Sequence, residues 1–409
     1  MRVVHLSTAD NIGGSGRSAY KIHKGLLNLG IDSKMLVGYK SCTDPDVVKI
    51  SKGIMSVSDK IAAKITNALS LQYLFMPSSI GLLRNPQIRA ADIIQLYNTH
   101  GNYFSHSVLP ALCKVKHVFW RLSDMWPVTG HCTYSGDCTL WMTGCKKCPD
   151  LACYPPLAFD SASLLWKWKK SVYCRSNIHL IAPSVWMSNI AMESPLLNIF
   201  KISVIPNGID TGIFKPLNKS TCRDRLSIPQ NKKVVLFLAH VVKNNPRKGG
   251  AFFAEVMNRL AAKHKGDIVA MIAGDGAKQL SDEINCPVWR HGFVNNDSLL
   301  ADIYNSADLI LHPAVAENLP NSVLEAMGCG VPAVAFDVGG VKDIVSHMET
   351  GYLAPVKDFE SLYNGTEMLL TDSVLYAALS ANCLKRVKSS HTLTGQAERF
   401  AALYSSCIK

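Results

Sequence analysis

The sequence predicts an α/β protein with two domains, each built on a parallel sheet with helices on both faces. Short apolar runs alternate with stretches of helical spacing along most of the chain, which is the pattern of βαβ units. Turn residues interrupt this alternation at 204–210, and it then starts again. The length of 409 residues fits, because two or three domains are expected at ~150 residues each.

The first domain begins with a buried strand at residues 3–7, a glycine-rich turn at 13–16 and a helix to about residue 29. The opening apolar run holds five residues and no small-residue cleavage site follows it, so it is interpreted as a strand and not as a signal peptide. A long helix is expected at 54–76, where apolar residues recur at helical spacing with lysines between them. Further strands are predicted at residues 34–37, 93–96, 118–120 and 178–182.

The second domain repeats the pattern. Its strands are predicted at residues 234–239, 268–273, 288–289, 309–312 and 332–336, and residues 385–409 have a helical pattern. The predicted domains are therefore 1–205, with a cysteine-rich insertion at 131–153, and 206–385. A C-terminal helix at 386–409 is expected to return to the first domain.

Composition and charge narrow the classes of function. Hydrophobic residues make up 48% of the chain and charged residues 18%, which excludes a disordered protein. No uninterrupted apolar run reaches the ~18 residues of a membrane-spanning helix. Residues 1–206 contain 22 basic and 11 acidic side chains, a net charge of +11, whereas residues 207–409 contain 21 and 20. The basic half indicates an anionic partner, which can be a lipid surface, a phosphorylated substrate or a nucleic acid.

Two carboxylates mark a strand-loop-helix corner in the second domain. The strand at 309–312 runs into a loop with Glu317, and a helix starting near Ser322 carries Glu325. A helix N-terminus suits a diphosphate, Glu325 can accept hydrogen bonds from ribose hydroxyls, and Glu317 can face a sugar. The alternative is an acidic loop followed by a capping carboxylate.

Two further strand ends support a nucleotide site. The strand at 234–239 is followed by Arg247 and Lys248, which are placed to pair with phosphates, although a solvated basic turn is the alternative. The strand at 268–273 ends at Gly274, where the missing side chain lets a ligand approach the backbone. Three such ends in one domain predict a nucleotide-diphosphate pocket.

These residues carry a specific resemblance. Glu317-x7-Glu325 within PAVAENLPNSVLEAMGCGVPAVAFDVGG, together with IPNGIDTGIFKP, APSVW and RKG, resembles glycosyltransferase family 4. The resemblance implies the GT-B fold, an α/β architecture of two Rossmann-like α/β/α domains facing across a cleft. It also implies transfer with retention from a nucleotide-diphosphate sugar that the second domain binds.

The resemblance also implies roles for single residues. Glu325 would hold the ribose, Lys248 the diphosphate, and Glu317 the donor sugar or its leaving phosphate. The remaining donor-binding residues implied are Gly14, Ser15, Arg247, Gly274, Asn321 and Ser322. Two departures stand out: Pro320 replaces a common glycine and has no N–H, and the usual arginine before the lysine is represented by Lys243 or Arg247.

The glycine-rich loop of the first domain is not a dinucleotide fingerprint. Gly13-Gly14-Ser15-Gly16 has the wrong spacing for G-x-G-x-x-G, and the second strand ends without an acidic residue for a ribose. In the resembled family this loop approaches the donor phosphates or the acceptor. A plain strand-to-helix turn is the alternative.

Two segments of the first domain resemble a subgroup that makes bacterial surface polysaccharides. The subgroup usually has His-Asn-x-His and His-Asp-x-Trp, where this chain has Tyr97-Asn98-Thr99-His100 and Ser123-Asp124-Met125-Trp126. His100 and Asp124 are therefore candidate catalytic residues beside Glu317. Tyr97 and Ser123 replace two usual histidines, so an enzyme with weakened activity is an alternative.

Four cysteines predict a metal site. Cys132-x5-Cys138-x6-Cys145-x2-Cys148 fits a tetrahedral structural zinc ion, and the segment has no clear helix or strand of its own. Free or redox-active thiols and an iron–sulfur cluster are the alternatives. No catalytic metal is expected, because four cysteine ligands leave no open position.

Residues 164–173 interleave aromatic residues with lysines, and Trp166 and Trp168 suit a lipid headgroup surface. The predicted 54–76 helix, which also carries lysines, could contribute to that surface. The alternatives are a partly buried helix and a site for single-stranded nucleic acid. An anionic membrane is the expected partner and nucleic acid is not.

The sequence thus predicts a retaining glycosyltransferase (hexosyltransferase class) that is cytoplasmic and peripheral at the inner membrane. It would move a sugar from a nucleotide-diphosphate sugar to a lipid-linked saccharide in exopolysaccharide, O-antigen or capsule biosynthesis. The alternatives are a catalytically weak GT-B binding subunit and a GT-B nucleotide-sugar epimerase. A sugar phosphorylase fits less well, because no cofactor-binding lysine is identified.

Overall fold

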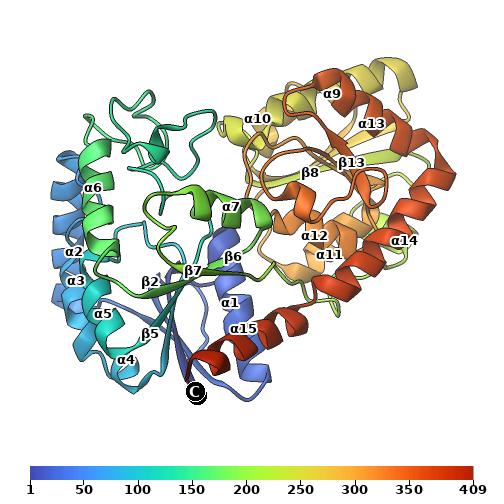
Figure 1. The fold of residues 1–409 in the computed structure, drawn as a ribbon. Helices are drawn as coiled ribbons and strands as arrows, with labels where there is room; N and C mark the ends of the chain where they lie inside the picture. The colour runs from blue at the N-terminus through green and yellow to red at the C-terminus, as the bar shows by residue number, and fades with distance from the viewer. Residues whose placement is uncertain (409) are drawn as a thin grey trace. The chain divides into compact units, whose positions relative to one another are not determined.

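The computed structural model describes residues 1–408, and the chain divides into two compact units (Figure 1). Unit 1 comprises Met1–Pro206 together with the chain from Gln396 onward, and unit 2 comprises Asn207–Gly395. The chain therefore passes between the units twice. Among the described residues, no helix is both long and apolar enough to cross a membrane.

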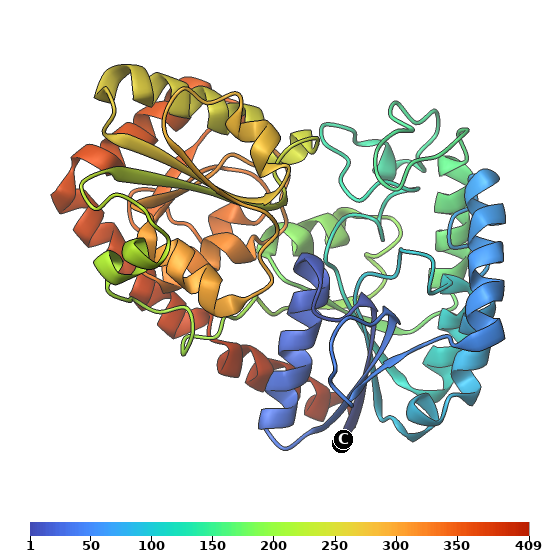
Figure 2. The ribbon, with the colours of Figure 1, turned by 180° about the vertical axis from the view of Figure 1, so that it is seen from behind.

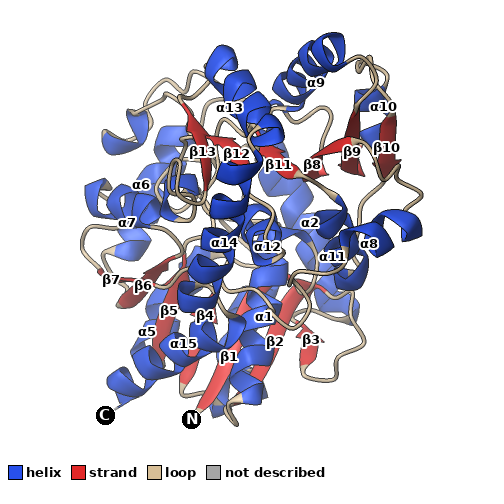
Figure 3. Cartoon of the chain, turned by 90° about the vertical axis from the view of Figure 1, so that its right-hand side faces the viewer, coloured by secondary structure: helices blue, strands red, loops and turns tan. Residues whose placement is uncertain are grey.

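Unit 1 is built on a seven-stranded sheet in which all neighbouring strands are parallel (Figure 3). The strand order is β3-β2-β1-β4-β5-β6-β7. Its strands are β1 (Arg2–Ala9), β2 (Asp32–Tyr39), β3 (Val47–Lys49), β4 (Ile93–Leu96), β5 (His117–Arg121), β6 (Ile178–Ala182) and β7 (Lys201–Val204). The strands β2 and β3 extend the sheet on one side of β1, and β4 to β7 extend it on the other. The loops after β1 and β4 therefore lie at a switch point of the sheet, where α/β proteins bind ligands.

Helices cover both faces of this sheet. They are α1 (Gly13–Asn28), α2 (Gly53–Ala68), α3 (Pro77–Ile80), α4 (Pro86–Ala90), α5 (Leu109–Val115), α6 (Ala162–Tyr173) and α7 (Val185–Glu193). One face packs α1 against the sheet through Ala19 and Ile22, and Figure 2 shows this helix in front of the strands. The other face forms a larger core that includes Leu112, Trp120 and Leu165.

The C-terminal helix α15 (Leu393–Ile408) completes unit 1. Phe400 and Tyr404 are fully buried in the same core as α1, and the Tyr404 hydroxyl donates to Gln95 Oε1 at 2.7 Å. The helical pattern predicted for 385–409 is broken in the structure, because α14 (Ser373–Ser390) ends first and Thr392 bridges to Ile209. Residues 386–395 belong to unit 2, so only the chain from Gln396 returns to the first unit.

Unit 2 is built on a six-stranded parallel sheet of order β10-β9-β8-β11-β12-β13. Its strands are β8 (Lys233–Val241), β9 (Ile268–Asp275), β10 (Val288–His291), β11 (Leu309–His312), β12 (Ala333–Phe336) and β13 (Gly351–Ala354). Its helices are α8 (Lys219–Arg225), α9 (Gly250–His264), α10 (Ala277–Ser281), α11 (Asp297–Ser306), α12 (Asn321–Gly328), α13 (Phe359–Thr371) and α14. The strands β8 and β11 are neighbours, so the loops that follow them lie side by side.

One predicted element ends early. The helix expected at 54–76 is α2, which stops at Ala68 because Ser70 and Tyr73 adopt left-handed backbone angles. The Ser70 hydroxyl accepts hydrogen bonds from the backbone N–H groups of Ala158 and Phe159. Tertiary contacts thus override the helical spacing of the apolar residues in this stretch.

Candidate functional site

The loops after β8 and β11 are fixed to one another. The backbone N–H of Val315 donates to Arg247 O at 2.9 Å, and the Arg247 guanidinium donates to Ala316 O at 2.8 Å. Gly249 has a φ of 75°, and a side chain there would collide with the carbonyl of Pro313. The sequence RKG therefore places Arg247 and Lys248 against the loop that carries Glu317.

Glu317 lies at the centre of this charged cluster. Lys248 Nζ forms an ion pair with Glu317 Oε2, which also lies 3.7 Å from Arg247 Nη1 and 3.9 Å from His312 Nε2. Burial disfavours the carboxylate, but the charges of Lys248, Arg247 and His312 outweigh burial and lower the pKa of Glu317 to about 2. Glu317 is therefore ionised at neutral pH although it is buried.

Burial acts on Lys248 in the opposite sense. It lowers the pKa of Lys248, and pairing with Glu317 only partly restores that pKa. The pair is therefore weaker than the lowered pKa of Glu317 alone would indicate. Of the two basic residues considered beside Lys248, Arg247 lies beside Glu317, whereas Lys243 pairs with Glu283.

His312, the last residue of β11, is a site residue that the sequence reasoning did not select. Its Nε2 atom is buried and has no hydrogen-bond partner among residues 1–408. Burial, opposed by Glu317, lowers the pKa of His312 to about 4, so the ring is neutral at pH 7. Its position at a strand end before a motif loop is the signal that could have identified it.

Glu325 lies in the first turns of α12 and is also buried. Its Oε2 accepts a hydrogen bond from the hydroxyl of Tyr304 at 2.9 Å. Asn321 begins α12, and its side-chain oxygen accepts from Asn207 Nδ2 at 2.8 Å. The Asn-Gly turn at 207–208 thus anchors the start of the helix, at which Ser322 is half-buried.

Two glycines of unit 2 are required for packing. A side chain at Gly274 would collide with the carbonyl of Ala239 on the neighbouring strand, so this glycine allows β9 to approach β8. A side chain at Gly339 would collide with the carbonyl of Glu317, which places the loop after β12 directly against the cluster. The first is a predicted donor-binding residue with a structural reason of its own, and the second is a residue the sequence analysis did not name.

In unit 1 the glycine-rich loop forms the start of α1. A side chain at Gly14 would meet no atom within 4 Å among the described residues, whereas one at Gly16 would collide with the carbonyl of Asp10. The Ser15 hydroxyl lies 2.9 Å from the hydroxyl of Ser123. Ser123, which stands where the resembled subgroup has a histidine, therefore contacts the glycine-rich loop.

His100 and Asp124 form a buried pair in unit 1. His100 Nε2 lies 2.9 Å from Asp124 Oδ2, and Asp124 Oδ1 accepts from the backbone N–H of Trp126 at 3.0 Å. His100 Nδ1 is buried and has no partner among the described residues. Tyr97, by contrast, directs its hydroxyl to His5 Nδ1 at 2.9 Å within the core.

Aromatic rings surround this pair. The rings of Tyr73, Trp126 and Tyr154 have their centroids 6.4, 5.9 and 5.9 Å from the His100 ring. Lys169, a fully buried residue of α6, lies 3.4 Å above the Trp126 ring and donates to Trp126 O at 2.6 Å. The sequence analysis expects the lysines of residues 164–173 at a lipid surface, whereas the structure shows Lys169 holding the loop that carries Asp124.

The cysteine-rich segment packs beside these loops in unit 1. Its one short helix is a 3-10 turn at Leu140–Met142. The hydrogen bond between Cys132 and Cys153 raises the pKa of Cys132 and lowers the pKa of Cys153. Among the described residues, Cys132, Cys138, Cys145 and Cys148 do not form a group with ligand atoms within 4.8 Å of one another.

The predicted aromatic surface of α6 is largely core. Trp166 is buried and donates to Trp141 O at 2.9 Å, Trp168 is partly buried, and Lys169 is inside. Lys167 and Lys170 are exposed. The partly buried alternative therefore describes α6.

Comparison with known proteins adds a family assignment for part of the chain. Residues 232–372 match the family model "Glycosyl transferases group 1", a range that contains the cluster around Glu317 and also Glu325. The matched residues all lie within unit 2.

Proteins similar to this chain include glycosyltransferases. The UDP-Gal:alpha-D-GlcNAc-diphosphoundecaprenol alpha-1,3-galactosyltransferase of Escherichia coli is 24% identical over 263 residues, which are 61% of this chain and 65% of that protein. The putative colanic acid biosynthesis glycosyl transferase WcaC of E. coli K12 is 24% identical over 361 residues, 81% of this chain and 82% of that protein. The chain thus spans less than two thirds of the first relative. These relatives support transferase activity.

Solved structures agree on the fold. Anabaena Alr3699/HepE, crystallised in complex with UDP and glucose, has a TM-score of 0.71 and 17% identity, covering 99% of this chain and 100% of that one. This likeness shows the fold alone, which is GT-B. The predicted fold class, two Rossmann-like α/β domains, is confirmed.

Proposed function

We propose that the chain is a retaining glycosyltransferase of family 4, which transfers a sugar from a nucleotide-diphosphate sugar to a lipid-linked saccharide in surface-polysaccharide synthesis. The observation that carries the proposal is the buried cluster in unit 2, where Lys248, Arg247 and His312 surround the ionised Glu317. Two cations in the loop after β8 suit a diphosphate, and the carboxylate that the loop after β11 places beside them suits a sugar with hydroxyls to donate.

The cluster supports the chemistry of sugar transfer. When the bond between the anomeric carbon and the phosphate oxygen breaks, negative charge develops on the leaving diphosphate. Lys248 and Arg247 would stabilise that charge, because fixed cations in a site with little water act strongly on developing charge. The acceptor hydroxyl would pass its proton to the leaving phosphate, so no further protein base is required for transfer with retention.

The names of the relatives support the substrate classes. The E. coli galactosyltransferase acts from UDP-Gal on a sugar linked to diphosphoundecaprenol, and WcaC is assigned to colanic acid biosynthesis. We propose the same classes here, a nucleotide sugar as donor and a lipid-linked saccharide as acceptor.

A ligand screen tests the donor proposal. The melting temperature of the purified chain would be measured in the presence of UDP-glucose, UDP-galactose, GDP-mannose and the free nucleotides. A donor at 100 times its Kd adds about 2.7 kcal/mol to stability, which raises the melting temperature measurably. We expect one nucleotide sugar to stabilise the protein and to be hydrolysed slowly. A chain that no member of the panel stabilises would contradict the proposal.

A catalytically weak binding subunit is the second candidate, and Ser123 is the residue that favours it. Ser123 contacts Ser15 of the glycine-rich loop. A serine cannot do what the imidazole of the resembled subgroup would do at position 123. Tyr97 is a weaker argument, because its hydroxyl is engaged by His5 in the core. Donor binding without donor hydrolysis would favour this candidate over an active enzyme.

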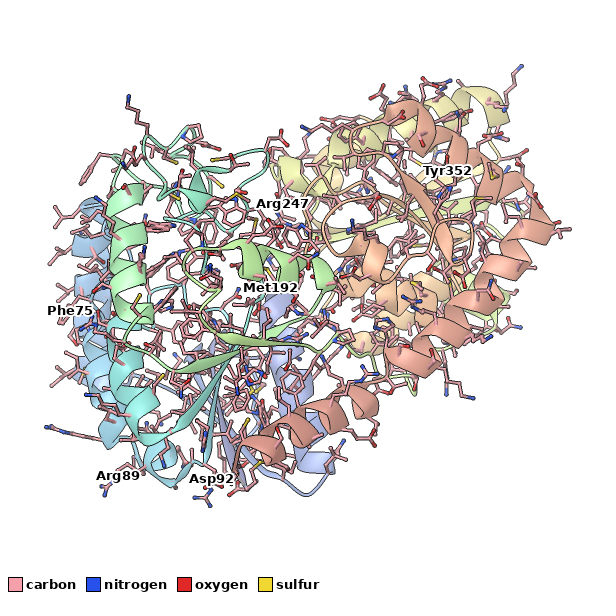
Figure 4. The ribbon with its side chains drawn as sticks, in the orientation of Figure 1. Phe75, Arg89, Asp92, Met192, Arg247 and Tyr352 are labelled. Carbon is pink, nitrogen blue, oxygen red and sulfur yellow. The ribbon has the colours of Figure 1, made fainter. Side chains whose placement is uncertain are left out.

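We also propose that α2 contacts an anionic membrane at the inner leaflet, in place of the α6 surface. One face of α2 exposes Ile54, Val57, Ile61, Ile65 and the adjoining Leu69, with Ile54 89% exposed. Lys60 and Lys64 flank this face, and Phe75 projects away from the ribbon beyond it (Figure 4). Apolar residues bordered by lysines are typical of helices that lie in a headgroup interface.

Flotation with anionic liposomes tests this surface. Ile61→Glu should reduce binding strongly, because it places a carboxylate in the apolar face. Leu164→Glu on α6 is the matched control, since Leu164 and Ile61 are both 56% exposed. Each lysine near the surface contributes about 1 kcal/mol at most, so binding should also weaken with salt. Equal effects of the two variants would contradict the proposal, as would retardation of single-stranded nucleic acid by a chain that ignores liposomes.

A structural zinc ion in the cysteine-rich segment remains a prediction. His131 Nε2 lies 3.3 Å from Cys148 Sγ, and the backbone N–H of Gly130 donates to Cys145 Sγ at 3.1 Å. Elemental analysis of protein purified without added metal should give about one zinc per chain. Native protein that contains no zinc and has all four thiols freely titratable would contradict it.

A further inference from the structure

A chain of buried hydrogen bonds crosses the core of unit 1. It runs from the hydroxyl of Tyr97 to His5 Nδ1 (2.9 Å), from His5 Nε2 to Ser33 Oγ (3.0 Å), and from Ser33 Oγ to His23 Nδ1 (2.7 Å). His5, Ser33, His23 and Tyr97 are all fully buried. The chain fixes the plane of the His23 ring and engages one of its two nitrogens.

The other ring nitrogen of His23, Nε2, takes no part in this chain of hydrogen bonds. Nε2 is buried and has no hydrogen-bond partner among residues 1–408, which is costly for a polar atom inside a protein. A ring nitrogen of His23 and one carboxylate oxygen each from Asp44 and Asp46 all lie within 4.8 Å of one another. Of the described residues, only these three bring histidine, cysteine or carboxylate ligand atoms together in this way.

The two carboxylates already have partners that reach in from the surface. Asp44 Oδ2 accepts from Lys24 Nζ at 3.1 Å and from the Tyr20 hydroxyl at 3.0 Å, and Asp46 pairs with Lys34. The side chains of Lys24 and Lys34 are 42% and 34% exposed. Flexible ammonium groups at the rim of a site can move into solvent when a doubly charged cation binds.

We propose that His23 Nε2, Asp44 and Asp46 bind one divalent transition-metal cation, with water completing its coordination. One imidazole nitrogen with two carboxylates suits Mn²⁺ and Zn²⁺ among the common divalent ions. The buried chain supplies the outer support such a ligand requires: His23 Nδ1–H donates to Ser33, Ser33 donates to His5 Nε2, and His5 Nδ1–H donates to Tyr97. In that arrangement His23 Nε2 presents its lone pair to the cation.

The site would fix the segment between β2 and β3. This segment also contacts Asp10, whose carboxylate accepts from the backbone N–H groups of Ser41 and Cys42, each at 2.8 Å. Asp10 lies three residues before Gly13, where the glycine-rich turn and α1 begin. The cation would therefore have a structural role, stabilising the segment that supports this turn.

Manganese binding to the full chain tests the proposal. Mn²⁺ is the suitable probe because it prefers carboxylate ligands, whereas thiolates such as those at 132–153 select zinc. Titration followed by the electron paramagnetic resonance signal of free Mn²⁺ should give one bound ion per chain. Asp46→Asn should weaken binding about tenfold or more, whereas Asp32→Asn should leave it unchanged. Asp32 is the matched control, because it lies on β2 and pairs with Arg2.

A gain-of-binding variant protects the test against misfolding. Lys34→Gln removes a competing ammonium group at the rim, so its affinity for Mn²⁺ should exceed that of the wild type severalfold. His23→Gln, checked for folding by its melting temperature, should lose the ion. The proposal is overturned if neither the wild type nor Lys34→Gln binds Mn²⁺, or if folded His23→Gln and Asp46→Asn bind it as tightly as the wild type.

Discussion

The candidate sites of the two units differ in the forces that build them. In unit 2, Lys248, Arg247 and His312 surround the buried carboxylate of Glu317. In unit 1, the His100–Asp124 pair lies among the rings of aromatic residues, with Trp126 both a neighbour of His100 and a backbone donor to Asp124. Fixed charges suit the phosphates of a donor, and rings with one polar pair suit a sugar hydroxyl. The comparison predicts that variants in the two units impair different steps.

The largest effect is expected for Lys248→Ala. Loss of a fixed cation at a leaving diphosphate should lower turnover about 10²–10³-fold, the usual cost of removing one preorganised electrostatic group. Lys243→Ala is the matched control, because Lys243 also follows β8 but pairs with Glu283. Steady-state rates of nucleotide release measure both. Similar losses in the two variants would mean that basic charge in this loop matters and the position of Lys248 does not.

Acid should destabilise unit 2 through Glu317. The pKa of Glu317 is about 2 in the folded chain, below its ordinary value, so its ionisation stabilises the fold above about pH 4.5. That contribution, at most about 3 kcal/mol, is lost as the pH falls from 4.5 towards 2. Burial lowers the pKa of Lys248 as well, so the net contribution is smaller.

Urea unfolding between pH 5 and pH 3 measures this effect. The unfolding free energy of the wild type should fall more steeply with acid than that of Glu317→Gln. Hydrogen exchange should locate the loss in unit 2 before unit 1. Parallel pH profiles of the two proteins would show that Glu317 is not held by its neighbours as described.

A smaller effect is expected for Asp124→Asn in unit 1. The substitution keeps the shape of the side chain but weakens the hydrogen bond that orients His100. One such bond is worth about 1.4 kcal/mol, so transfer to the acceptor should fall about tenfold. Affinity for the nucleotide sugar should stay unchanged, as should its slow hydrolysis. A parallel loss of donor affinity would remove the distinction between the two sites.

The sequence identified the central strands of both sheets and missed three edge strands. The strand at Ile93–Leu96 was predicted with its observed bounds because a central parallel strand is apolar on both faces. The strands β3, β7 and β13 lie at sheet edges, are three or four residues long and have mixed burial, so no continuous apolar run marks them. The spacing of apolar residues in a sequence reflects which positions are buried, and strands at the edge of a sheet are only partly buried.

The sites divide in the same way. The motif spacing predicts Lys248, Glu317 and Glu325 as site residues. It does not include His312, whose one signal in the sequence is its place at a strand end and whose contact with Glu317 arises only in the folded chain. The alternation of lysines with tryptophans in α6 predicts a surface that contacts lipid, yet Lys169 is buried against the ring of Trp126. Composition alone does not show which face of a helix meets the core.

Donor affinity of Glu325→Ala tests the central claim most directly. Calorimetry with the nucleotide sugar found by the ligand screen should show a loss of about 1–3 kcal/mol for the missing hydrogen bonds to the ribose. Two variants accompany it: Tyr304→Phe removes the hydroxyl that bonds Glu325 but keeps the carboxylate, and Glu360→Ala removes an exposed carboxylate of unit 2. Glu325→Ala should bind the donor weakly while its free energy of unfolding stays at the wild-type value. Glu360→Ala should bind the donor nearly as tightly as the wild type. Donor affinity unchanged in folded Glu325→Ala would contradict it.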